Sequence, residues 1–159
     1  MKVALAESLK NKDQFEKVKM LDFFCGFPDS EIWEIIRAGV WIEADVDETI
    51  VVEGDVEDSS YIIISGDVAV LKQGTHVGCL GKGDCFGEMG YLSRIKRTAT
   101  VTAQGPVSLL RVNATLIEQV TSDCQLRFYK VFMKILIERF SITTNLMVQA
   151  SRDDPKQSF

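Results

Sequence analysis

The first forty residues carry two patterns that predict helices. In residues 2–19 charged side chains of both signs occur throughout, which is typical of a polar, exposed helix. Residues 27–39 instead place isoleucines at helical spacing, at positions 32, 35 and 36. Asp29 or Ser30 is expected to cap the start of this second helix, and Gly39 to lie at its end. The chain is thus expected to begin with helices, the first of them an extension that is mobile or packs on a partner.

From Val40 to Val112 the pattern changes to short β-like runs separated by glycine and aspartate. The runs read VWIEA, TIVVEG, SYIIIS, DVAVLK, HVGCL, TATVTA and VSLLRV. Runs of this length with turn residues between them are typical of a sandwich or barrel, not of alternating β-α units. Turns are expected at Ser65–Asp67 and Lys72–His76. The segment predicts an antiparallel β-roll or jelly-roll, interrupted conspicuously at residues 83–97.

Beyond Asn113, a candidate N-cap, the pattern becomes helical again as far as about Gln149. Between Phe128 and Ile142 most positions are apolar, which leaves a narrow polar stripe at positions 130, 134 and 138. A helix that is apolar over most of its circumference needs covering on more than one side. We expect one side to pack on the β region and the other, from about Cys124 to Gln149, to pair in a homodimer.

Length and charge limit the organisation and the class of partner. A chain of 159 residues can bury one core. We expect a helical extension over residues 1–20, one domain over 21–150 and a polar, disordered tail over 151–159. The net charge of −5 and the isoelectric point near 4.9 disfavour general nucleic-acid binding, which depends on Lys and Arg. No helix-turn-helix pattern follows the long helix, so a DNA-binding activator is not expected.

The cysteines and the N-terminal residues indicate the compartment. The cysteines, at positions 25, 79, 85 and 124, include no C-x-x-C pair, and His76 is the one histidine, so zinc-site spacing is absent. We expect His76 to be solvated. Residues 1–19 lack an apolar segment, which predicts neither a signal peptide nor a membrane span. We therefore expect a cytoplasmic protein whose thiols are reduced core residues.

The interruption, GDCFGEMGYLSRIKRTATV, combines residue types suited to an anionic ligand. Phe86 and Gly87 allow a sharp turn in which backbone and ligand come close. EMGYL predicts a short helix whose free N-terminal amides attract anions. Arg97 supplies a planar fork of donors that matches phosphate oxygens. Glu88 would repel a phosphate, so it suits a neighbouring ribose hydroxyl. Together these features predict a nucleotide of low negative charge.

The stretch GDCFGEMGYLSRIKRTATVTA resembles the phosphate-binding cassette of the cyclic nucleotide-binding domain family. That family includes protein kinase A regulatory subunits, cyclic-nucleotide-gated channels and bacterial catabolite activator proteins. IVVEGDVEDSSYIIISGDVAVLK is similar to the family's strand-turn-strand signature, with Gly54, Asp55 and Gly66 at matching positions. The resemblance covers about Leu21 to Phe140. It implies a mainly β fold with flanking helices (α+β): an antiparallel β-roll with N-terminal helices and a long C-terminal helix.

The resemblance also implies the ligand and its site. The ligand would be cAMP or cGMP, with no cofactor and no metal. Glu88 would hold the ribose 2′-hydroxyl and Arg97 the cyclic phosphate. Thr98 stands where the family has a residue that contacts phosphate or purine, and family members with this threonine bind either nucleotide. Gly87 and the amides of Met89 and Gly90 would line the cradle. The complete predicted set is Phe86, Gly87, Glu88, Met89, Gly90, Arg97, Thr98 and Ala99. Two residues depart from the family pattern, Tyr91 in place of an aliphatic residue and Cys85 before the phenylalanine.

Three classes of function are open to such a chain. A stand-alone sensor would transmit cyclic nucleotide occupancy through its C-terminal helix to an unidentified protein partner. The alternative is a scaffold or dimerisation module of the same fold that binds another effector or none, since some family members lack nucleotide binding. Taken singly, Arg97 and Glu88 also fit structural roles at a strand start and a helix start. An enzyme is not expected, because the sequence offers no nucleophile elbow, metal ligands or paired carboxylates with a histidine.

Overall fold

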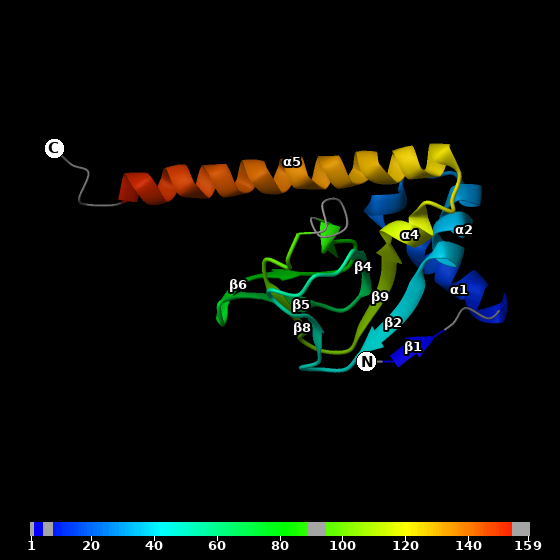
Figure 1. Ribbon diagram of the computed structural model, residues 1–159, viewed down its shortest axis with the longest axis horizontal. Helices are drawn as coiled ribbons and strands as arrows, with labels where there is room; N and C mark the ends of the chain where they lie inside the picture. The colour runs from blue at the N-terminus through cyan, green and yellow to red at the C-terminus, as the bar shows by residue number, and fades with distance from the viewer. Residues whose placement is uncertain (1, 5–7, 89–94, 154–159) are drawn as a thin grey trace. The chain divides into compact units, whose positions relative to one another are not determined.

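The computed structural model describes residues 2–4, 8–88 and 95–153. The chain forms two compact units, Met1–Gln125 and Leu126–Phe159. The first unit holds the strands and the N-terminal helices, and the second consists of most of one long helix (Figure 1).

Two antiparallel sheets make up the β part of the first unit (Figure 1). One sheet has the strand order β1 (Lys2–Ala4), β2 (Val40–Ala44), β9 (Val107–Asn113), β4 (Ser59–Ser65) and β7 (Cys85–Phe86). The other has the order β3 (Thr49–Val51), β8 (Thr100–Ala103), β5 (Val68–Lys72) and β6 (Thr75–Leu80). Each β-like run of the sequence therefore forms a strand, and the predicted antiparallel β-roll is confirmed.

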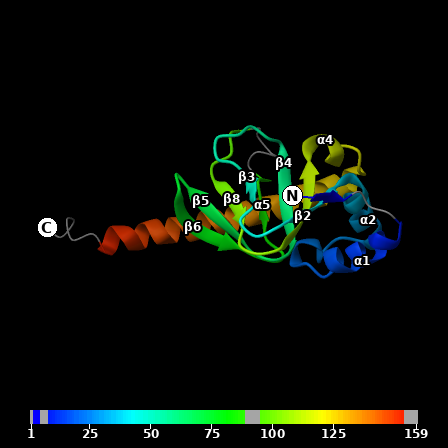
Figure 2. The ribbon, with the colours of Figure 1, turned by 90° about the horizontal axis from the view of Figure 1, so that it is seen from below.

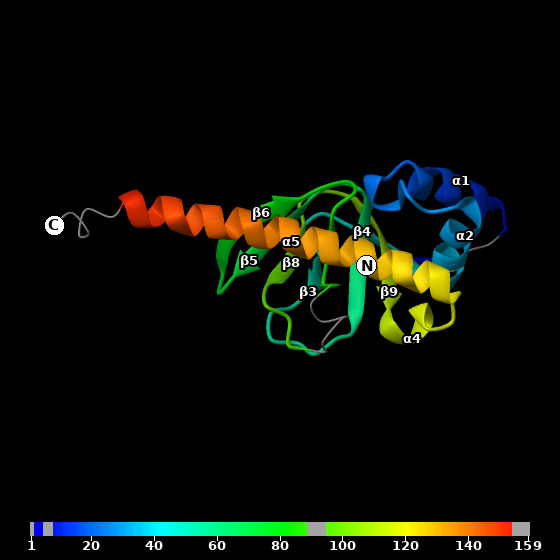
Figure 3. The same ribbon diagram turned by 90° about the horizontal axis from the view of Figure 1, so that it is seen from above.

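Helices of the first unit gather at one end of the β-roll. Those whose full range the structure describes at this end are α1 (Ser8–Lys19), η1 (Asp22–Phe24), α2 (Asp29–Ala38) and α4 (Ala114–Ile117). Figure 2 and Figure 3 show α1, α2 and α4 at the end opposite the β5–β6 hairpin. The site of interest lies in the segment between β7 and β8, which joins the two sheets.

The N-terminal segment differs from its prediction in two respects. Lys2–Ala4 is a strand that pairs with β2, and the expected helix begins only at Ser8. The N-cap of α2 is Pro28, which makes no side-chain cap hydrogen bond, so neither Asp29 nor Ser30 caps the helix. Asp29 instead lies in the first turn, where its negative charge interacts favourably with the helix dipole. Its carboxylate also pairs with Lys19 Nζ at 3.2 Å.

Gly39 ends α2 as predicted. It is the C-cap residue, and its N–H donates to Ile35 O at 2.8 Å. A Cβ at Gly39 would lie 2.6 Å from Leu110 Cδ1 and 3.2 Å from Arg111 O. The close approach of β9 therefore favours glycine here, because a larger residue would have to displace the Leu110 side chain and crowd the backbone of β9.

The predicted C-terminal helix is divided in two. Asn113 caps α4 as expected, and its side chain accepts from Leu116 N at 2.8 Å. The helix stops at Ile117, and α5 (Ser122–Asp153) begins after Thr121, whose amide and hydroxyl donate hydrogen bonds to Glu34 of α2. Helix α5 also includes residues 151–153, which were expected to be disordered, and residues 154–159 lie outside the described part.

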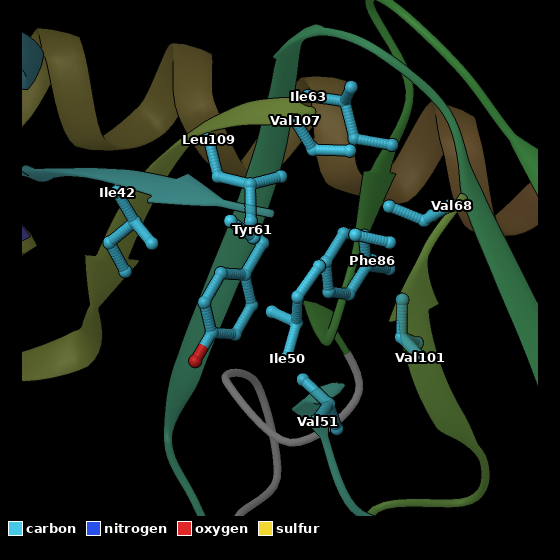
Figure 4. Close-up of a cluster of buried hydrophobic side chains, with 12 residues drawn as sticks. Ile42, Ile50, Val51, Tyr61, Ile63, Val68, Phe86, Val101, Val107 and Leu109 are labelled. Atoms are coloured by element: carbon cyan, nitrogen blue, oxygen red, sulfur yellow. The ribbon is translucent and has the colours of Figure 1, made fainter. Parts of the chain in front are cut away.

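A hydrophobic cluster fills the space between the sheets (Figure 4). Both sheets contribute buried side chains to it, including Ile42, Tyr61, Phe86, Val101 and Leu109. The rings of Tyr61 and Phe86 stack with centroids 5.0 Å apart and planes inclined by 8° (Figure 4). This stack joins β4 to β7 directly before Gly87, so the core fixes the start of the turn at that glycine.

The thiols are only partly core residues. Cys85 and Cys124 are buried, whereas Cys25 and Cys79 are exposed, which corrects the prediction for these two. His76 is exposed as predicted, but it lies in β6 and not in a turn, with its Nε2 3.4 Å from Cys79 Sγ. The bulge between Val70 and Leu71 in the β5–β6 pairing explains how residues three apart meet.

Candidate functional site

The loop between β3 and β4 holds the backbone of Arg97. Arg97 N donates to Asp55 O at 2.7 Å, and Gly54 N donates to Arg97 O at 2.9 Å. An isolated antiparallel bridge joins Val56 to Lys96 on the adjoining residues. The strand-turn-strand motif and the interrupting segment, far apart in the sequence, thus meet at Arg97.

The guanidinium of Arg97 is buried, with the residue 5% exposed. Nη1 donates to Gly87 O at 2.9 Å and Nη2 donates to Ser59 O at 2.5 Å. Nη2 also lies 3.3 Å from a carboxylate oxygen of Glu57, and the Tyr61 ring lies 5.9 Å from Cζ. Nε is buried and has no hydrogen-bond partner among the described residues. The buried charge of Arg97 is therefore compensated by these acceptors, while its Nε donor remains available among the described residues.

Gly87 fits closely against this guanidinium. Its φ is +81°, a backbone conformation that residues with a side chain rarely adopt. A Cβ there would lie 2.6 Å from Arg97 Nη1. The same Cβ would lie 2.8 Å from Ser59 O. Both the backbone conformation and the space require glycine, as the sequence predicted for a sharp turn.

The remaining predicted residues have different surroundings. Phe86 is buried in the core and contributes by holding Gly87 in place. Glu88 is helical and only 5% exposed. Thr98 is exposed and Ala99 half-buried, both directly before β8. Met89 and Gly90, with most of the predicted helix that begins at Glu88, lie outside the described residues.

Residues 42–124 match the family model described as "Cyclic nucleotide-binding domain". The chain belongs to the cyclic nucleotide-binding domain family. This match covers both sequence motifs and every predicted site residue, and it confirms the family that the motifs suggested.

Solved structures agree on the fold of this cyclic nucleotide-binding domain. A cyclic nucleotide-binding domain from Methylobacillus flagellatus KT is 20% identical with a TM-score of 0.77, over 89% of this chain and 84% of that one. The catabolite activator protein of Thermus thermophilus is 21% identical with a TM-score of 0.69, over 81% of this chain and 62% of that one. The regulatory subunit of a cAMP-independent protein kinase A from Trypanosoma brucei is 23% identical with a TM-score of 0.69, over 80% and 47%.

Glu57 is a residue of the site that the sequence interpretation missed. One of its carboxylate oxygens accepts from the Tyr61 hydroxyl at 2.8 Å, and the other faces Arg97. Burial raises the pKa of Tyr61 above its ordinary value, and the hydrogen bond to Glu57 raises that pKa further. No local signal singles it out, because in EGDVEDSSY it is one of several acidic residues that precede the tyrosine of the strand.

Lys72 and Glu53 form a second arrangement that the sequence did not indicate. Lys72 Nζ donates to Thr98 O at 2.6 Å and pairs with Glu53 at 3.2 Å. Glu53 accepts from Gln73 N at 2.9 Å, and its pKa is lowered by this bond and by Lys72. The end of β5 is thereby joined to the exposed Thr98.

Metal sites and membrane spans are both absent from the residues that the structure describes. In those ranges no group of three or more His, Cys, Asp or Glu side chains could hold a metal ion. None of the helices there is long and apolar enough to cross a membrane.

Proposed function

We propose that this domain is a sensor that binds a cyclic nucleotide, cAMP or cGMP, without catalysing a reaction on it. The observation that carries the proposal is Arg97: its buried guanidinium beside Gly87 keeps Nε without a partner among the described residues. A buried donor without an acceptor costs free energy, so an anionic oxygen bound there is favourable. The family supports the same ligand class, and the structures of relatives include one with cAMP bound to a protein kinase A regulatory domain from Toxoplasma gondii.

The predicted residues have distinct roles in this proposal. Arg97 would bind the cyclic phosphate and Glu88 the ribose 2′-hydroxyl. Gly87, followed by the amides of Met89 and Gly90, would leave room for the phosphate. Phe86 would anchor the turn, and Thr98 and Ala99 would flank the phosphate or purine.

Calorimetric titration with cAMP and cGMP tests the binding. Saturating nucleotide at 100 times its Kd should stabilise the fold by about 2.7 kcal/mol, which a thermal shift also detects. Linear 5′-AMP is the matched control, because it has the base and sugar but carries more negative charge on an open phosphate. Absence of heat and of thermal shift with both cyclic nucleotides would disprove the proposal.

A scaffold that binds another effector or none is the second candidate. The similarity to a subunit described as cAMP-independent supports it, since the same fold serves that protein. Against it, this chain keeps both the buried arginine and its glycine neighbour. The same titration separates the two candidates directly.

We also propose that α5 pairs with a second copy and transmits occupancy to a protein partner. Its exposed apolar side chains include Met133, Ile137, Phe140 and Met147, and their spacing of four, three and seven is that of a coiled-coil seam. A homodimer about a two-fold axis would bury this stripe. Transmission further requires that the nucleotide bind one arrangement of the helix better than another. The cytoplasmic location stays a prediction.

Light scattering with and without nucleotide tests the pairing. Ile137→Glu with Phe140→Glu should convert a dimer to a monomer, because two charges would be buried in the seam. Ser141→Glu with Asn145→Glu is the matched control, since it adds the same charge to exposed polar positions of the same helix. A parent protein that is monomeric at high micromolar concentration in both states would contradict the dimer.

A further inference from the structure

Glu57 has a position at Arg97 that competes with the proposed ligand. Nε and Nη2 lie along one edge of a guanidinium group, and paired donors of this kind bind carboxylates and phosphates in a bidentate manner. Here Nε has no partner in the described part of the chain, and Nη2 has Glu57 at 3.3 Å. Of the two donors on this edge, Nη2 therefore faces a carboxylate and Nε has no partner among the described residues.

The other contacts of the guanidinium are of a different kind. Gly87 O and Ser59 O are backbone acceptors, at 2.9 Å from Nη1 and 2.5 Å from Nη2. They belong to β4 and to the turn after β7, which the core holds in place, so they stay when a ligand binds. The contact between Glu57 and Nη2 is longer than the two backbone contacts, at 3.3 Å. The side chain of Glu57 is also 33% exposed, while that of Arg97 is 3% exposed. Of the three acceptors, Glu57 is the one able to leave.

The geometry points to Glu57 as an internal counter-ion that occupies Arg97 in the ligand-free domain and gives way to the phosphate of a bound nucleotide. This inference rests on the proposed function. Among the described residues Glu57 is the carboxylate in an ion pair with Arg97, so its removal would leave the buried guanidinium without that neutralising charge, which is costly in a protein interior. With a phosphate in place, Glu57 becomes a second anion beside it and is repelled. The exchange therefore sets the affinity of the site.

Tyr61 positions the carboxylate of Glu57 through a hydrogen bond. Its hydroxyl donates to Glu57 at 2.8 Å, and its ring is fixed by the stack on Phe86. When the carboxylate leaves Arg97, the tyrosine remains a partner for it, since the hydroxyl lies on a different carboxylate oxygen from the arginine. The acidic residue at position 57, in the loop before β4, can therefore pair with Tyr61 alone or with Tyr61 and Arg97 together.

Titration of Glu57→Gln with cAMP and cGMP tests the inference. The variant keeps the shape of the side chain and loses its charge, so it should bind the nucleotide roughly twofold to fivefold more tightly, as fits a partly exposed ion pair. Its ligand-free melting temperature should fall at the same time, because the charge of Arg97 is no longer compensated. Tighter binding and lower stability together distinguish a competitor from a residue that merely positions Arg97.

Controls separate this inference from the proposed function. Asp58→Asn removes the same charge one residue further along, where the described residues show no contact with Arg97, and should change affinity by less than Glu57→Gln. Tyr61→Phe keeps the ring but removes the partner that Glu57 retains after it leaves Arg97, so it should weaken binding, in the direction opposite to Glu57→Gln. If parent and variants all fail to bind cAMP and cGMP, the proposed function fails. If the parent binds and Glu57→Gln binds equally or more weakly, the counter-ion inference alone is overturned.

Discussion

Gly87 and Arg97 fit together through a single backbone carbonyl. Gly87 O accepts from Arg97 Nη1 at 2.9 Å, while a Cβ on Gly87 would lie only 2.6 Å from that nitrogen. Gly87→Ala should therefore displace the guanidinium and strain a backbone at φ +81°. We expect a loss of unfolding free energy of about 1–3 kcal/mol and a large loss of nucleotide affinity. Denaturant unfolding and calorimetry measure the two effects.

Gly74→Ala is the matched control for strain. Gly74 has a similar φ of +77°, but a Cβ there would meet nothing within 4 Å. It should lose stability through backbone strain alone and keep its affinity. Equal affinities for the parent and Gly87→Ala would show that the close fit to Arg97 has no part in binding.

Arg97 serves both the fold and the proposed ligand. Arg97→Ala removes the donors to Gly87 O and Ser59 O and leaves Glu57 without its cation, so the melting temperature should fall. Nucleotide affinity should fall by about 2–3 kcal/mol, as charged hydrogen bonds do. Arg97→Lys should recover only part of both, because an ammonium group lacks the planar fork.

The two losses are measured separately. Circular dichroism at low temperature identifies the folded fraction of each variant, and calorimetry is then done where that fraction is complete. A folded Arg97→Ala protein that binds as tightly as the parent would exclude the phosphate role.

Tyr61 predicts a pH dependence at the alkaline end. Burial and the hydrogen bond to Glu57 raise its pKa above the ordinary value of 10.0, so the folded state holds the proton more tightly than the unfolded state. The stability from this difference is complete below about pH 10 and is lost as the pH rises towards the folded pKa. Tyr61→Phe should make the unfolding free energy decline less steeply above pH 10, in denaturant unfolding at a series of pH values. Identical slopes for parent and variant would contradict the raised pKa.

The β-roll followed from local signals, because short alternating runs with glycine and aspartate between them restrict the chain to antiparallel pairs. The motif around Gly87 and Arg97 was readable for a similar reason, since the turn that needs glycine and the arginine that faces it lie within one short stretch of sequence. The hydrogen bonds between Thr121, directly before α5, and Glu34 were not readable, because the two residues lie 87 positions apart along the chain. A hydrogen bond between distant segments leaves no periodicity in either of them.

The position of Glu57 was missed for a related reason. In the sequence it is one of several acidic residues in a turn, and nothing local separates it from Asp55 or Asp58. Only the folded chain brings it to Arg97, forty positions later. The strand at Lys2–Ala4 was missed because three residues are too few to show a period, and its pairing with β2 decides its conformation.

Glu34 anchors the start of α5, and its removal is the last test. Its carboxylate accepts from Thr121 N at 2.7 Å and from Thr121 Oγ1 at 3.1 Å, so Glu34→Ala should lower the unfolding free energy by about 1 kcal/mol, the net contribution typical of such hydrogen bonds. Arg37→Ala, at an exposed position of the same helix, is the control and should change it little. Denaturant unfolding measures both variants. Equal stability of Glu34→Ala and the parent would mean that α5 begins without this anchor.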